Sequence, residues 1–148
     1  MRKITIFATV EMLLFLLLSN GEAQTNLHFA SERGDFNEVV RLLDNGADVN
    51  IHDSNSLAPL DYALDSGNLK LVSLLLERGA DVNNRDKHFG STALHYAATI
   101  GNLELISLLL ERGADINIYD KNGVTPLGMA KIMKQEEAIE LLVKHGAR

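Results

Sequence analysis

Histidine side chains are the first candidates for acid–base chemistry or metal binding in this chain, which contains five of them. His28 and His95 occupy the same place in a repeated pattern, whereas His52, His88 and His145 are scattered. No His-x-x-x-His or Glu-His spacing of the kind that holds zinc occurs. We therefore expect His28 and His95 to be structural, and we predict no metal site.

Other catalytic groups are also missing from the sequence. The chain has no cysteine, which excludes disulfides, thiolate zinc sites and a cysteine nucleophile. No glycine-rich phosphate loop follows a strand, and no nucleophile motif is present. The plentiful Asp and Glu residues fall at turns and helix ends, where solvation and capping account for them. The sequence predicts that the protein is not an enzyme, has no catalytic residues and needs no cofactor.

Charge and size limit the partners further. The formal net charge is −6, which argues against electrostatic binding to nucleic acid or to an anionic membrane. The 148 residues suit one domain, and 46% are hydrophobic, which is enough for a core. We expect a monomer that does not bind nucleic acid.

The N-terminal segment has a different composition from the rest. Residues 1–23 combine a positive start at Arg2 and Lys3, an apolar run over 4–18, and small residues at Gly21 and Ala23. This order predicts a cleaved signal peptide and an exported protein, periplasmic or secreted. The run is shorter than the ~20 residues of a spanning helix, and Glu11 interrupts it. The alternative is an uncleaved membrane anchor formed by residues 4–18.

The elements that must position any site are internal repeats. The segment SLLLERGAD occurs at 73–81 and again at 107–115. A Gly-Ala pair recurs at Gly46, Gly79, Gly113 and Gly146, with spacings of 33, 34 and 33 residues. These markers divide the chain into unit 1 (25–51), unit 2 (52–84), unit 3 (85–118) and unit 4 (119–148).

Each unit contains two short stretches with helical periodicity. In unit 3 the second stretch runs over 103–111, and Gly113 is suited to the left-handed residue that closes a helix. Helices this short do not persist alone in water. The identical copies are therefore interpreted as surfaces on which successive units stack.

Several spaced motifs resemble the ankyrin repeat. They are Thr92-Ala93-Leu94-His95-Tyr96-Ala97-Ala98, Gly101-Asn102-Leu103, and Leu108-Leu109-Leu110-x-x-Gly113-Ala114-Asp115-Ile116-Asn117. The resemblance covers residues 25–148. It implies an all-α ankyrin-repeat solenoid of four helix–turn–helix units with projecting β-turn loops, preceded by the N-terminal apolar segment. It also implies that the His28 and His95 rings bridge backbone and hydroxyl groups between units.

Units 2 and 4 depart from this pattern. Ala58 and Asp61 replace the usual Thr and His in unit 2, whereas Gly128 and Lys134 replace His and the inter-helix Gly in unit 4. The last helix of unit 4 carries a polar outer face, which is typical of a C-terminal cap.

The resemblance implies that partners bind to the turn tips and to the inner sides of the first helices. The predicted partner-binding residues are Asn55, Leu57, Asp65, Lys87, His88, Phe89, Ser91, Thr99, Lys121 and Asn122. Phe89 lies in a turn that is one residue longer than its counterpart in unit 4. Its ring is either an exposed binding group or a filler for the inserted residue.

Two functions fit these features. The first is a non-enzymatic protein–protein interaction module that docks a partner on its concave face. The alternative is a structural or protective accessory protein associated with the membrane or with a companion enzyme.

Overall fold

The computed structural model describes residues 27–148, so the predicted signal peptide or anchor lies outside the described residues. A helical segment at 27–32 is followed by α2 (Phe36–Asp44), α3 (Pro59–Asp65), α4 (Leu69–Glu77), α5 (Ala93–Ile100), α6 (Leu103–Glu111), α7 (Pro126–Ile132) and α8 (Glu136–Lys144). The described residues form no strand, and none of their helices is long and apolar enough to cross a membrane.

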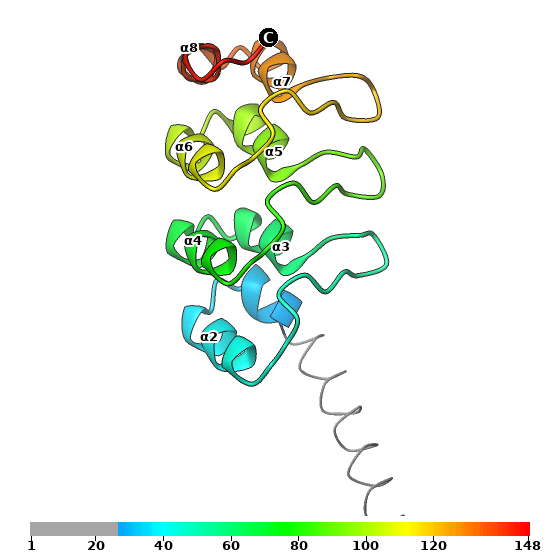
Figure 1. The fold of residues 1–148 in the computed structure, drawn as a ribbon, viewed down its shortest axis with the longest axis vertical. Coiled ribbons are helices and arrows are strands. Elements are labelled where there is room, and N and C mark those ends of the chain that lie inside the picture. The colour runs from blue at the N-terminus through cyan, green and yellow to red at the C-terminus, as the bar shows by residue number, and fades with distance from the viewer. Residues whose placement is uncertain (1–26) are drawn as a thin grey trace, which may run out of the picture.

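The helices form two parallel columns (Figure 1). The first helices of the units, namely 27–32, α3, α5 and α7, make one column, and the second helices α2, α4, α6 and α8 make the other. Three long loops project from the column of first helices, all to the same side (Figure 1). This arrangement confirms the predicted helical solenoid.

Repeated residues set the ends of the second helices. The side chains of Asn68 and Asn102 accept hydrogen bonds from the first-turn N–H groups of Leu71 and Leu105, which starts α4 and α6. Gly113 follows α6 with a φ of 88°, and its amide donates to the Leu110 carbonyl. A side chain at this left-handed position would be strained, so glycine recurs there in every unit.

The core lies between the two columns and runs through the whole stack. Leu75 of α4 and Leu109 of α6 are both 0% exposed and pack with other buried aliphatic side chains of the units. Leu108, next to Leu109, is only partly buried: it packs against this core and also lines a shallow depression with Leu141 and Glu111.

A ladder of asparagines links the units on the way into each loop. The Asn50 side chain donates to the Gly79 carbonyl and accepts from the Asp81 amide, at 3.0 and 2.8 Å. Asn83 makes the same two bonds one unit later, to Gly113 and Asp115. These bonds explain why the Asp-x-Asn sequence recurs after each Gly-Ala pair.

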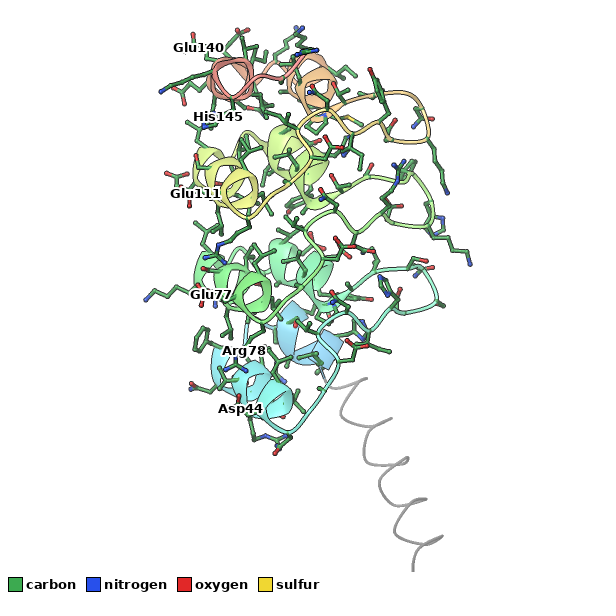
Figure 2. The ribbon with its side chains drawn as sticks, viewed as in Figure 1. Asp44, Glu77, Arg78, Glu111, Glu140 and His145 are labelled. Carbon is green, nitrogen blue, oxygen red and sulfur yellow. The ribbon has the colours of Figure 1, made fainter. Side chains whose placement is uncertain are left out.

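Charged side chains line the outer column. Asp44, Glu77, Glu111 and Glu140 lie on successive second helices (Figure 2). Arg78 pairs with Asp44 at 2.8 Å, and Arg112 pairs with Glu77 at 3.1 Å, so each pair joins neighbouring units. Because these groups are solvent-accessible, they contribute little to stability and mainly keep the outer face soluble.

Candidate interaction face

Each projecting loop ends in a hairpin built around an aspartate. The hairpins span 53–57, 86–91 and 120–124, and in each the aspartate N–H donates to the carbonyl of the last residue. The Asp53 Oδ1 atom accepts from the amides of Asn55 and Leu57, at 2.8 and 2.9 Å. Asp120 Oδ1 makes the equivalent pair with Asn122 and Val124.

These hydrogen bonds favour the ionised form of the hairpin carboxylates. Burial acts to raise the pKa of Asp53, Asp86 and Asp120, but the backbone hydrogen bonds outweigh it and lower the pKa of each. Each aspartate charge therefore stabilises its turn, because the carboxylate holds the backbone amides of the hairpin in place.

The middle hairpin accommodates its extra residue by changing its turn. The Gly90 amide donates to the Asp86 carbonyl four residues earlier, whereas Ser56 and Gly123 donate to carbonyls three residues earlier. Asp86 then binds the amides of His88, Phe89 and Ser91. The Phe89 ring is 63% exposed, so the first of the two interpretations of this residue, an exposed aromatic, describes the structure.

Neighbouring hairpins are joined at their tips. The Lys87 amide donates to the Asn55 carbonyl at 2.9 Å, and the Lys121 amide donates to the Phe89 carbonyl at 2.8 Å. The ammonium groups of Lys87 and Lys121 also donate to the preceding hairpin, at the carbonyls of Ser54 and Lys87. Both lysines of the predicted binding set therefore hold the hairpins in line.

His95 connects units 3 and 4, as the sequence predicts. Its Nδ1 atom accepts from the Thr92 amide at 3.2 Å and lies 3.0 Å from the Thr92 hydroxyl. This leaves the proton on Nε2, which donates to the Val124 carbonyl at 3.0 Å. Burial lowers the pKa of His95, so the ring is neutral at pH 7. His28 differs, because its Nε2 atom lies 3.0 Å from the Ile51 carbonyl at the end of its own unit and does not reach the next hairpin.

Asp61 takes the place of the missing histidine in unit 2, where its partner Asn84 leads the chain into unit 3. Its Oδ2 atom accepts from the Ala58 amide and from the Asn84 side chain, both at 2.7 Å. A carboxylate cannot donate to a carbonyl, and Asn84 supplies the donor instead, also reaching the Ser56 carbonyl. Burial raises the pKa of Asp61 in this position.

A groove opens on the inner side of this junction, between α3 and α5. Its volume is about 230 Å³. Apolar and aromatic side chains make most of its wall, and carboxylates lie at its edge. The lining residues are Leu57, Asp61, Tyr62, Leu64, Asp65, Asp86, Ser91, Thr92, Ala93 and Tyr96.

A family model of ankyrin repeats in three copies matches residues 6–86 and again 83–148. The chain belongs to the ankyrin-repeat family. Ankyrin repeats are generally protein–protein interaction modules, and the family is typically non-enzymatic. The chain matches none of the curated proteins compared with it.

The ankyrin fold separates the predicted binding residues into two groups. Asn55, Lys87, His88, Phe89, Lys121 and Asn122 are exposed at the hairpin tips. Leu57, Asp65 and Ser91 meet in the groove. Thr99 belongs to neither group, because its hydroxyl donates to the His95 carbonyl and its own carbonyl accepts from Gln135.

Sequence reasoning missed the two tyrosines of the groove and the inward position of Asp61. Tyr62 follows the Leu-Asp pair of unit 2, and Tyr96 follows the Leu-His pair of unit 3. Both lie in the first helix of their unit and line the groove. An aromatic at that place in consecutive units was the available signal. Among the described residues, no group of His, Asp or Glu side chains is arranged to hold a metal ion.

Proposed function

We propose that this ankyrin domain docks a protein partner on its inner face, defined as the three hairpin tips together with the exposed sides of the first helices. The observation that carries the proposal is Phe89, a largely exposed aromatic ring at the tip of the lengthened hairpin. Exposed aromatic side chains are enriched among residues that dominate binding energy. The protein performs no catalysis in this proposal and contributes only a surface.

The hairpin that carries Phe89 is already ordered before any partner arrives. Asp86 fixes three of its amides, and the tip is bonded to the hairpins on both sides through Lys87 and Lys121. Fixing a loop before binding reduces the entropy lost on association. This supports a docking role for the ring more than a role as a mobile surface residue.

The contrast between repeated and unrepeated residues supports the same face. The outer helices α4 and α6 are nearly identical in sequence and stack on their neighbours. The hairpin tips Ser54-Asn55, Lys87-His88-Phe89 and Lys121-Asn122 differ from one another. Differences gathered on one face are expected where a single partner meets several units.

Site-specific cross-linking tests the proposal. A photoreactive amino acid placed at Phe89 in the native cell should yield one covalent adduct, and the same adduct should form from Asn122. Placement at Val143, an apolar residue of the outer helix α8 that is 54% exposed, serves as the control. Adducts of equal yield from Val143 would refute docking on the inner face.

We also propose that the protein is exported, with cleavage after Ala23. The support is the charged start, the apolar run of 4–18 and the small residues before Gln24. N-terminal sequencing of the protein from its native cell should read from Gln24. An intact Met1 on a membrane-associated protein would favour the anchor instead.

A further inference from the structure

The groove between α3 and α5 exists because the first helices are unevenly spaced. Helix α5 packs much more closely on α7 than on α3. The space left on the α3 side is bounded by Leu57 and Leu64 of unit 2 and by Tyr96 of unit 3. The groove therefore combines side chains of units 2 and 3. Its lining includes no residue of unit 1 or unit 4.

All the charged residues that line the groove are acidic. They are Asp61, Asp65 and Asp86. Asp86 is engaged by hairpin amides, and Asp61 by Ala58 and Asn84, so these two supply a fixed negative potential. Asp65 differs from them because it is exposed, and no ion pair between described residues includes it.

The position of Asp65 is unfavourable for the isolated domain. It is the last residue of α3, where the helix dipole is negative and a carboxylate is repelled. It also lies near Tyr96: burial, followed by the charge of Asp65, raises the pKa of that hydroxyl. A cation placed beside Asp65 would offset the repulsion from the helix dipole.

We propose that the groove receives the side chain of an arginine from the partner protein, an inference that rests on the docking function proposed above. The guanidinium plane stacks on the Tyr96 or Tyr62 ring and donates two hydrogen bonds to Asp65. The methylene stem lies against Leu57 and Leu64. Lysine fits less well, because its compact, strongly hydrated ammonium does not stack on a ring or bind a carboxylate through two parallel bonds.

Chemical-shift titration of the ¹⁵N-labelled full-length protein tests this inference. The probes are N-acetyl-arginine amide, the lysine equivalent, and the citrulline equivalent, which keeps the shape of arginine without its charge. The arginine probe should shift the amides of Tyr62, Asp65 and Tyr96 in a saturable way. The lysine probe should bind more weakly, and citrulline should give no saturable shift. Equal shifts from citrulline would overturn the proposal.

Two variants separate the proposed contacts from general effects on folding. Asp65→Asn should weaken the arginine probe about fivefold, as expected for loss of an accessible ion pair of about 1 kcal/mol. Tyr96→Leu keeps an apolar wall and should weaken it by a similar factor. Glu104→Gln, which removes an exposed carboxylate from the outer helix α6, is the control and should leave binding unchanged. Unchanged binding by Asp65→Asn would overturn the proposal.

The result of the arginine titration can be distinguished from the result of the cross-linking experiment. Cross-linking from Phe89 together with no saturable arginine binding keeps the inner face and refutes the arginine groove. Saturable arginine binding with no adduct from Phe89 or Asn122 supports the groove and refutes docking at the tips. Dimerisation that shifts the same three amides without any probe would assign the groove to a second copy of this chain and overturn the partner's arginine.

Discussion

The junction of units 2 and 3 and the junction of units 3 and 4 solve one problem with different chemistry. Each must hold a hairpin loop against the preceding first helix. At the later junction a neutral His95 donates to the Val124 carbonyl, and α7 lies close against α5. At the earlier junction a carboxylate, Asp61, accepts from Asn84, and α5 stands away from α3.

The difference teaches that the ankyrin stack does not depend on one particular inner contact. The outer helices α4 and α6 have nearly the same residues and bury equivalent aliphatic side chains, whereas α8, the neighbour of α6 at the later junction, has a different sequence. The continuous aliphatic core runs through both junctions, although the inner contact is an imidazole at one and a carboxylate at the other. The more open of the two junctions is the one that contains a groove.

The largest expected effect tests whether the outer helices α4 and α6 contribute equally to stability. Leu75→Ala and Leu109→Ala should each destabilise the protein by about 2–5 kcal/mol, because both side chains are fully buried in the continuous core. Urea denaturation of both variants measures this. Leu108→Ala is the matched control and should cost about 1 kcal/mol, since that side chain is partly exposed. A Leu75 variant much more stable than the Leu109 variant would break the equivalence.

The inner contacts should differ in strength. His95→Ala should destabilise the protein by about 2–3 kcal/mol, because it leaves the Val124 carbonyl and the Thr92 amide without partners in a closed junction. Asp61→Ala should cost only about 1 kcal/mol, because removal of a buried carboxylate offsets part of the lost hydrogen bonding. Thermal and urea unfolding give both values. A greater loss for Asp61→Ala would reverse the proposed order.

The two junctions should respond to pH in opposite directions. The pKa of His95 is lowered in the fold by burial, so protonation favours the unfolded chain and stability falls as pH drops below about 6.5. The pKa of Asp61 is raised by burial, so the fold regains stability as pH falls through that raised pKa toward about 3.9.

Unfolding free energies measured from pH 7 to pH 4 check both signs. His95→Gln should lose less stability than the wild type between pH 7 and pH 5. The unfolding free energy of the wild type, relative to that of Asp61→Asn, should increase as the pH falls from 7 toward 4. Parallel curves for the wild type and His95→Gln would contradict the first sign.

The smallest expected effect concerns the hairpin of the earlier junction. Ser56 has a φ of 61°, at the place where the other hairpins have Gly90 and Gly123. Ser56→Gly should stabilise the protein by about 0.5–1 kcal/mol, because glycine removes left-handed strain at some cost in chain entropy. Thermal unfolding detects the change, and Ser54→Gly is a control in the same hairpin. Equal effects of the two variants would exclude relief of strain.

The sequence predicted the solenoid because its markers are local and repeated. Gly113, the Asn102 cap and the leucines of α6 act within one unit, so their spacing alone indicates the helices they end, begin and bury. The link between Asp61 and Asn84 could not be predicted, because it pairs a departure from the motif with a residue 23 positions later in the chain. The groove also depends on how far α5 stands from α3, a distance that no residue pattern specifies.

The turn of residues 86–90 contains one additional residue and is hydrogen-bonded to the hairpins on both sides. The bonds of Lys87 to the hairpin before it and of Phe89 to the hairpin after it are both present beside the additional residue. The additional residue at this tip therefore leaves the hydrogen bonds between neighbouring hairpins in place. Short foreign peptides could be grafted there for display, and natural lineages could vary this tip in length without rebuilding the scaffold beneath it.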